Sequence, residues 1–393
     1  MENTQNTAAN FIAAAQNALA SGDEASRKQM LEAARQVAGM LETPLDTIWR
    51  MIMSPHAPAA LMTLIKAGVI QEITKSDSPT TADHLSTTTG AEKLLIVRLL
   101  RPLAALGFVK EVCAEQYVPT PITKALVGRA LLGGFQFQFS AATRSLANMP
   151  FYLEKTGFKH VSGSPGPFQD AHDTQDNMYL WLIKDPPMLS NFNAFMTGQR
   201  ADRKQWFDFL DVNGILLEGA RKDSDAILLI DIAGGEGHDI AEFHRRYPDA
   251  PGRLVLQDSP SVIDSIQELT PKVERQKYDF FEEQPIKGAR CYYFRSIFHN
   301  WPDADCIKIL KNTAAAMKPG YSKLLLSEFV LPASNCPLYP AILDINMMTL
   351  LNGMQRTEDQ FSELLDAAGL KVVKFWSVGA ETEGLVEATL KNE

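Results

Sequence analysis

The sequence predicts an α/β protein with a doubly wound parallel sheet in its C-terminal half and a mostly helical, winged-helix-like domain before it. Through the first 200 residues, apolar side chains recur at spacings of three and four, as in amphipathic helices. From residue 226 onward, short apolar runs alternate with helical patterns, which is typical of parallel strands joined by helices. A chain of 393 residues also exceeds the size of most single cores, so we expect two domains, at 1–200 and 201–393.

The N-terminal half reads as a series of helices followed by a small β-hairpin. Two helices at 82–86 and 91–106, then a hairpin at 107–118, follow the order of a winged helix-turn-helix. Such a module can bind DNA or pack a dimer, and the near-balanced charge of segment 85–108 favours dimer packing. Residues 148–176 are rich in Gly, Pro, Ser and Asp and predict a long loop. Further helices are expected at 8–20, 24–41, 43–53, 56–67, 178–196 and 204–217.

The C-terminal half predicts alternating strands and helices in a fixed order. The first strand, at 226–232, is a continuous apolar run that ends in a glycine turn, as expected of a strand buried on both faces. Ligands of such sheets bind outside the carboxyl ends of the strands. Further strands are expected at 253–258, 289–294, 323–330, 371–377 and 385–390, and helices at 239–246, 261–269, 304–317, 341–351 and 357–368.

The charge of the chain is concentrated in its second half. Residues 1–200 hold 17 basic and 17 acidic side chains, whereas residues 201–393 hold 21 and 30, which accounts for the whole net charge of −9. Nucleic-acid binding needs clustered Lys and Arg, so we expect no nucleic-acid partner. The field of the acidic half suits a cationic ligand better than a polyanion.

The cysteines and histidines exclude several other classes of site. The four cysteines are scattered without a CxxC pair, and the seven histidines lack an HExxH arrangement, so we expect no metal site and no disulfide framework. This cysteine usage predicts a cytoplasmic protein. No apolar run approaches the roughly 20 residues of a membrane helix, and residues 1–20 favour an amphipathic helix over a signal peptide.

A glycine turn and three acids predict the cofactor site. Asp231 ends the first strand, and Gly234, Gly235 and Gly237 follow at spacings that match neither GxGxxG nor a P-loop. Glycines let the backbone approach a ligand closely at a helix N-terminus, and an acid before the turn favours a cationic group over a pyrophosphate.

Two further elements extend this site. Asp258 ends the next strand, where it can accept hydrogen bonds from ribose hydroxyls. Asp279 and Phe280 follow, where they can bond an adenine amine and stack on its ring. A nucleoside, a cation and no phosphate together describe S-adenosylmethionine (SAM).

Five motifs make residues ~190–393 similar to the plant and fungal caffeate-type, SAM-dependent O-methyltransferases. The N-terminal half resembles the winged-helix dimerisation domain of that family. The resemblance implies a Rossmann-like catalytic domain, a homodimer, a small-molecule substrate, and contacts to SAM from Gly234, Asp258, Asp279, Phe280 and Arg295. It also implies substrate-pocket walls at Phe192, Met196 and Met347. The motifs lie at 231–237, 256–263, 292–303, 324–332 and 353–357.

His299 is the predicted general base. A phenol with a pKa of about 10 is little ionised at neutral pH, and a histidine with a pKa of about 6.5 can take its proton as the methyl bond forms. His299 follows the strand at 289–294, where the family places its base, and Glu328 at the end of the next strand would orient the imidazole.

Two departures from the family motif leave a second function open. Asn300, a substrate-site candidate, stands where the family has Asp, and Gln355 stands where it often has a second acid. Some relatives in fungal polyketide and pyridone-alkaloid pathways keep SAM but act as pericyclases or dehydrating cyclases. In that case Arg295 would reach a substrate carbonyl as well as SAM and stabilise developing negative charge.

Overall fold

The computed structural model describes residues 2–199, 204–379 and 382–391. These residues form two compact units, Met1–Gly128 and Arg129–Glu393. The division by contacts falls before the domain boundary predicted at 200/201, because the helices that follow Gly128 pack with the second unit. The predicted fold class is confirmed: a helical N-terminal part precedes an α/β domain. Within the described ranges, no helix is long and apolar enough to cross a membrane.

The first unit contains the winged-helix element predicted from the sequence. Helices α6 and α7 precede the antiparallel hairpin of β2 and β3, and β1 adds a third short strand beside β3. Its core is made by apolar side chains of α4, α5 and α7. The bounds are α4 His56–Lys66, α5 Val69–Ile73, β1 Thr80–Thr81, α6 Ala82–Thr89, α7 Lys93–Ala105, β2 Val109–Cys113, β3 Gln116–Pro119 and α8 Pro121–Leu126.

Three helices precede this core: α1 (Glu2–Ser21), α2 (Glu24–Leu41) and α3 (Pro44–Met53). Helices α2 and α3 begin close to the positions predicted from the sequence. The side chains of Asp23 and Thr43 accept hydrogen bonds from backbone N–H groups of the first turn and so cap these helices. Helix α3 has no buried residue although most of its residues are apolar. Its exposed apolar side chains are Leu45, Ile48, Trp49, Met51, Ile52 and Met53.

The second unit opens with a group of helices that precedes the sheet. The loop predicted at 148–176 is wrong at two segments, because α10 runs on to Lys155 and α11 occupies Pro167–His172, whereas residues 156–166 and 173–176 form no helix or strand. The helix predicted at 178–196 is interrupted before Pro186, since the residue preceding a proline is disfavoured in helical conformation. The bounds are α9 Arg129–Phe137, π-helical η1 Gln138–Thr143, α10 Arg144–Lys155, α11 Pro167–His172, α12 Met178–Ile183 and α13 Pro186–Gly198.

The sheet has seven strands in the order β11-β12-β8-β7-β4-β5-β6. The strands from β6 to β8 in this order are parallel, and β12 and β11 join at one edge in antiparallel pairing. The strand order changes direction at β4, because β5 lies on one side of β4 and β7 lies on the other. Ligands of such sheets bind at this switch point. The bounds are β4 Ile227–Ile232, β5 Arg253–Asp258, β6 Val273–Lys277, β7 Cys291–Arg295, β8 Lys323–Glu328, β11 Leu370–Trp376 and β12 Gly384–Leu390.

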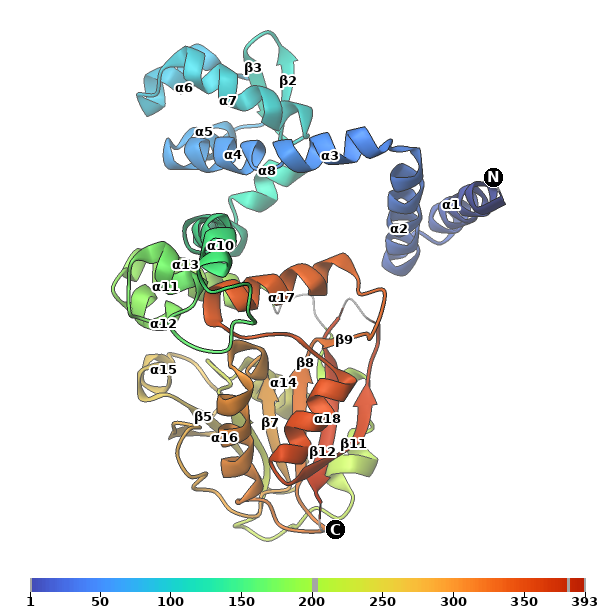
Figure 1. The fold of residues 1–393 in the computed structure, drawn as a ribbon, viewed down its shortest axis with the longest axis vertical. Coiled ribbons are helices and arrows are strands. Elements are labelled where there is room, and N and C mark those ends of the chain that lie inside the picture. Colours follow the sequence, from blue (N-terminus) through green and yellow to red (C-terminus); the bar gives the residue numbers. More distant parts are fainter. Residues whose placement is uncertain (1, 200–203, 380–381, 392–393) are drawn as a thin grey trace. The chain divides into compact units, whose positions relative to one another are not determined.

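Helices cover both faces of the sheet, as a doubly wound fold requires (Figure 1). One face packs against α16 and α18, and the other against α14, α15 and the segment before β4. That segment forms short 3-10 and π turns, so the α-helix predicted at 204–217 is wrong. The bounds are η2 Trp206–Asp208, η3 Asn213–Leu217, α14 His238–Arg246, α15 Pro260–Ser265, η4 Phe298–Asn300, α16 Asp303–Ala314 and α18 Glu358–Ala367.

Helix α17 (Leu338–Leu351) links the sheet to the helices before it. It contacts α10, α11, η1 and η4. Leu350 of α17 is buried in one cluster with Phe137, Phe168 and Leu182. A two-stranded ribbon of β9 (Val330–Leu331) and β10 (Arg356–Thr357) brackets this helix.

Candidate active site

The glycine turn connects β4 to α14 in a strained, tightly packed conformation. Ala233, Gly235 and Gly237 all have positive φ angles, of 58°, 63° and 80°. A Cβ at Gly234 would lie only 2.5 Å from the carboxyl carbon of Asp231, so this position accepts no side chain while Asp231 keeps its place. A Cβ at Gly235 would meet no atom within 4 Å. The turn therefore places backbone without side chains beside a buried carboxylate, as close approach of a ligand requires.

Asp258 joins the glycine turn to the end of β5. Its Oδ2 accepts a hydrogen bond from the Gly235 backbone N–H at 2.9 Å, and its Oδ1 accepts one from Ser259 at 2.7 Å. Its carbonyl accepts the N–H of Tyr278, which ties the loop after β6 to the same edge. The carboxylate is thus held at the carboxyl edge of the sheet, where we predicted a ribose contact.

Asp279 and Phe280 lie at the end of β6, next to this edge. Asp279 is exposed, and its Oδ1 accepts the N–H of Phe281 at 2.9 Å. Phe280 is half-buried and packs edge-on to Phe281 and Trp301, with ring centroids 5.1 and 6.0 Å away. The predicted adenine contacts are therefore brought to one end of the sheet together with Asp258.

Arg295 lies at the end of β7 and is only 7% exposed. Its Nε donates to Glu383 at 2.8 Å and its Nη1 to both oxygens of Asp239 at 2.9 and 3.0 Å. Burial opposes its charge, but Glu383 and Asp239 outweigh burial and raise the pKa of Arg295. Tyr293 also donates to Asp239, at 2.9 Å. The guanidinium forms ion pairs with two carboxylates, Asp239 and Glu383. These ion pairs weaken the electrostatic stabilisation that Arg295 could give to a substrate carbonyl.

The charges along this edge fit SAM better than a phosphate-bearing nucleotide. Asp231, Asp258 and Asp279 bring three carboxylates to the ends of three adjacent strands, and Arg295 is already paired with two others. Carboxylates suit the hydroxyls of a ribose and the positive charge of a sulfonium, and they repel phosphate. Arg295 Nη2 is buried and has no hydrogen-bond partner within the described residues, so a donor site remains beside the carboxylates.

His299 lies on the short η4 turn directly after β7. The turn is positioned by Glu328 at the end of β8, whose Oε1 accepts the backbone N–H groups of Ile297 and Phe298 at 2.8 and 2.7 Å. The other carboxyl oxygen, Oε2, lies 3.6 Å from Nδ1 of His299. Glu328 is fully buried, and burial raises its pKa to about 7, although the two backbone hydrogen bonds oppose this. His299 and Glu328 are therefore brought together as predicted from the motif, with a carboxyl group that titrates near neutrality.

The two departures from the family motif have different surroundings. Asn300 donates from Nδ2 to the carbonyl of Ser296 at 3.0 Å, so its amide is engaged within the η4 loop. Gln355 reaches His299 directly: its Nε2 lies 2.9 Å from the Nδ1 of the imidazole. The sequence marked Gln355 only as a missing acid. Its contact with the ring becomes visible only when the segment before β10 is placed beside η4.

The predicted substrate walls lie on two helices of the second unit. Phe192 and Met196 are half-buried on α13, and Met347 is buried on α17. Phe192 packs edge-on to Phe137 at 5.0 Å and to Tyr179 at 6.1 Å. These contacts make the walls continuous with the apolar cluster of α9–α13, and their role in binding substrate stays a prediction.

Tyr179 of α12 is a site candidate that the sequence did not indicate. Burial, with a smaller contribution from the carboxylate of Asp258, raises the pKa of Tyr179 to about 12. The charge of Asp258 therefore acts on a ring that also packs against Phe192. No local signal marks this tyrosine, because its nearness to Asp258 depends on how α12 folds against the sheet.

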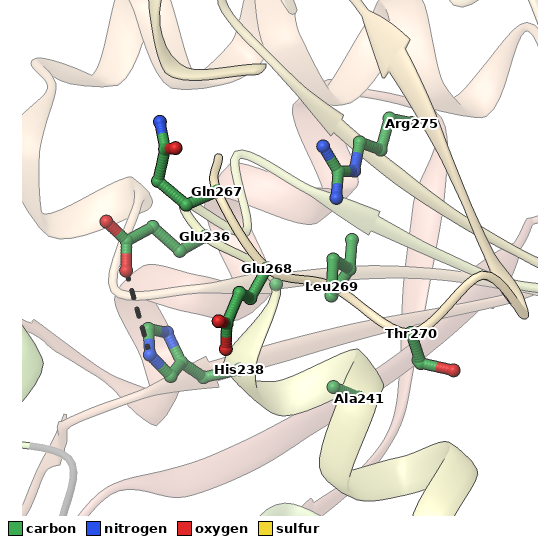
Figure 2. A pocket seen from close by; sticks show the side chains of 9 residues that line it. Glu236, His238, Ala241, Gln267, Glu268, Leu269, Thr270 and Arg275 are labelled. Carbon is green, nitrogen blue, oxygen red and sulfur yellow. Dashed lines mark ion pairs between the residues drawn. The ribbon is translucent and has the colours of Figure 1, made fainter. Parts of the chain in front are cut away.

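A pocket of about 510 Å³ lies beside the glycine turn but carries a different set of side chains (Figure 2). Three of its ionisable side chains contact other groups of the protein. His238 Nε2 lies 3.8 Å from Glu236 Oε2, and Arg275 donates to the carbonyl of Ile266 at 3.1 Å. It shares only Gly237 with the predicted cofactor contacts.

Comparisons with known proteins agree with this geometry. An O-methyltransferase domain matches residues 213–371, and an O-methyltransferase dimerisation domain matches residues 49–129. The chain is 38% identical to O-methyltransferase asqD of Emericella nidulans over 79% of this chain and 81% of that protein. It is 34% identical to O-methyltransferase penC of Penicillium thymicola over 93% and 92%.

Solved structures with the same fold include complexes with SAM and with sinefungin. LepI in complex with SAM has a TM-score of 0.87 at 26% identity and covers 99% of this chain and 100% of that chain. OxaC in complex with sinefungin and meleagrin has a TM-score of 0.86 at 30% identity and covers 99% of each chain. With a matching domain pair, near-full-length relatives and an acid-lined glycine turn, the chain belongs to the SAM-dependent O-methyltransferase family.

Proposed function

We propose that this protein transfers a methyl group from SAM to a phenolic or polyketide-derived hydroxyl of a small secondary metabolite, with His299 as general base. The observation that carries the proposal is the placement of His299 beside the acid-lined edge, on a turn held by Glu328. Names of relatives support the substrate class. One is demethylsterigmatocystin 6-O-methyltransferase of Aspergillus flavus, 28% identical over 94% of each chain, and OxaC was solved with oxaline.

The residues at the carboxyl ends of the strands are assigned to cofactor binding. When bound, SAM supplies an electrophilic methyl group on its sulfonium. The bare backbone of Gly234, Gly235 and Gly237 and the carboxylates of Asp231 and Asp258 hold the cofactor at the strand ends. Asp279 and Phe280 would recognise its adenine. Fixing the cofactor and the hydroxyl in near-attack geometry removes much of the entropic part of the barrier.

His299 and Glu328 handle the proton. The imidazole accepts the hydroxyl proton as the new O–C bond forms, which contributes about 10²–10⁴ in rate. The imidazolium that results lies 3.6 Å from Glu328 Oε2. Because the pKa of Glu328 is about 7, its ionised form is available above neutral pH to stabilise that cation.

The direct test is His299→Ala with methyl-labelled SAM and a panel of phenols and polyketide-derived hydroxyls. Turnover should fall by about 10²–10⁴ while SAM affinity, measured by calorimetry, stays within a few-fold of wild type. Retained SAM affinity serves as the control for folding. Near-wild-type methylation by the variant would remove His299 from the mechanism.

A pericyclase or dehydrating cyclase is the second candidate. It is favoured by the neutral residues Asn300 and Gln355 beside His299, and by likeness to a structure described as a pericyclic reaction enzyme, with a TM-score of 0.87 at 26% identity. In such a reaction SAM would survive many turnovers, and Arg295 or His299 would donate a hydrogen bond to substrate. Release of one S-adenosylhomocysteine per product excludes this candidate.

We also propose that the protein is a cytoplasmic homodimer. Its four cysteines are free thiols, as expected in a reducing compartment. The dimerisation domain match begins at residue 49, within the exposed apolar helix α3. An unburied helix of this composition needs a partner surface, and a second copy of the chain supplies one.

A further inference from the structure

The segment that follows α17 packs against the turn that carries His299. Residues 353–356, the strap, lie against the His299 turn through backbone and side chains. A Cβ at Gly353 would lie 2.0 Å from the His299 carbonyl oxygen, so the two backbones are in direct contact. Arg356, 1% exposed, donates to the carbonyls of Phe298 and Trp301 at 2.7 and 3.0 Å. The strap therefore holds the η4 turn through backbone contact and hydrogen bonds, in addition to the two hydrogen bonds that the turn donates to Glu328.

Gln355 is the strap residue that touches the imidazole. Its backbone N–H donates to Asp344 of α17 at 2.7 Å, and its side chain is 2% exposed. The amide end that faces Nδ1 of His299 lies 2.9 Å from it, a hydrogen-bond distance. A buried contact at this distance selects which ring nitrogen carries the proton, because Nδ1 must donate to an oxygen or accept from an N–H.

The nearby charge decides between these two states. Oε2 of Glu328 lies 3.6 Å from the same Nδ1, and a carboxylate there favours a proton on Nδ1. A half-turn of the Gln355 amide about its last side-chain bond exchanges the positions of its oxygen and nitrogen, so either atom can face Nδ1 of His299. In the placement with nitrogen toward the ring, Gln355 Oε1 is buried without a hydrogen-bond partner in the described part of the chain. Turning the amide gives that oxygen the Nδ1–H as its donor.

We propose that Gln355 is a positioning residue whose amide oxygen accepts the Nδ1–H of His299 and so holds the tautomer whose Nε2 lone pair accepts the substrate proton. This inference rests on the proposed base role of His299. A neutral amide orients the ring as an acid would, but adds no charge to stabilise the imidazolium. The base therefore keeps a lower pKa than a glutamate at residue 355 would impose, and it stays deprotonated to lower pH.

The tautomer can be read without any substrate. Protein labelled with ¹⁵N-histidine is compared with His299→Asn to assign the two ring nitrogens of His299, above the pKa of the imidazole. Wild type should show a protonated Nδ1 and an unprotonated Nε2. Gln355→Met, which has similar length and no hydrogen bond, should show a mixture of tautomers. A protonated Nε2 in wild type, or an unchanged tautomer in Gln355→Met, would overturn the inference.

Kinetics of the same variants separate positioning from general stability. Gln355→Met should lower kcat about 10- to 100-fold with an unchanged KM for SAM, as expected when a base is misoriented. Gln355→Glu should restore most of kcat and move the acid limb of the pH–kcat profile to higher pH. Equal loss in both variants, with no shift of the acid limb, would contradict positioning. If His299→Ala stays active, the proposed function fails while the NMR result still decides the role of Gln355.

Discussion

At the scale of single residues, the site depends on carboxyl groups whose surroundings differ sharply. Asp258 accepts two backbone N–H groups at a half-buried strand end, whereas Glu328 is fully buried and its pKa is raised by burial to about 7. A raised carboxyl pKa means that the folded state disfavours the ionised form. The protein accepts that cost at Glu328, since the same carboxyl holds the His299 turn through two backbone hydrogen bonds.

The cost at Glu328 predicts a pH-dependent effect on stability. Its pKa rises from 4.5 to about 7 on folding, so wild type loses stability from this group as pH increases through that range, by about 3 kcal/mol in all. Glu328→Gln cannot ionise and still offers an oxygen to Ile297 and Phe298. The difference in unfolding free energy, variant minus wild type, should become about 2–3 kcal/mol more positive between pH 5 and pH 8. Urea unfolding at both pH values measures it, and a constant difference would show that the pKa of Glu328 is not raised.

At the scale of elements, the strap after α17 and the helix α3 have the clearest consequences. The strap meets the His299 turn so closely that Gly353 has no room for a methyl group. Helix α3 shows the opposite condition, since its apolar side chains are not buried by the residues that the structure describes. The strap is held by close packing against the His299 turn, whereas α3 presents an exposed apolar surface.

Gly353→Ala tests the packing of the strap. A Cβ 2.0 Å from the His299 carbonyl oxygen requires the strap or the η4 turn to move, and overpacking of this kind costs about 1–3 kcal/mol or more. We expect a lower melting temperature and a large loss of kcat. Gly163→Ala is the matched control, because a Cβ there would meet no atom within 4 Å. Similar behaviour of the two variants would contradict the close contact.

Trp49→Glu together with Ile52→Glu tests the α3 surface. Both residues are 54% exposed. Charged side chains at these positions would lose their hydration when the α3 surface is buried in a dimer, so the substitutions disfavour dimer formation. The pair should shift the solution mass from dimer toward monomer in sedimentation at micromolar concentration. Gln16→Glu, an exposed charge on α1, should leave the mass unchanged. A wild-type monomer would count against the homodimer itself.

At the scale of the whole molecule, the distribution of charge and the two compact units set what the protein can bind. The excess of acidic residues lies entirely after residue 200, in the part that carries the predicted sulfonium site. The cofactor residues all belong to the second unit, Arg129–Glu393. Binding of SAM should therefore stabilise that unit selectively.

Thermal unfolding with and without SAM measures this linkage. SAM at a hundredfold excess over its Kd should add about 2.7 kcal/mol to the unfolding free energy of the unit that binds it. Asp258→Ala should abolish most of the stabilisation, because it removes the carboxylate that reaches both the glycine turn and the ribose position. Asp264→Ala removes an exposed carboxylate on the next helix, 63% accessible, and should respond to SAM like wild type. Equal loss in both variants would remove Asp258 from the cofactor site.

The sequence by itself determined the order of the sheet's strands except β6, the winged-helix element, the acid-lined glycine turn, and the adjacency of His299 and Glu328. Each of these depends on residues close in the chain or on strand ends that a parallel sheet brings to one edge. It missed the helical segments 148–155 and 167–172 and wrongly predicted an α-helix at 204–217, where composition and local periodicity compete with packing.

Only the tertiary structure decided how the charged and polar groups are paired. Arg295 is neutralised by Asp239 and Glu383, which lie 56 and 88 residues away in the chain, and Gln355 reaches His299 across 56 residues. Such partners lie on different elements that converge at the carboxyl edge of the sheet. The spacing of residues along the sequence does not predict these contacts, because the contacts result from how the strands and the crossing helices pack.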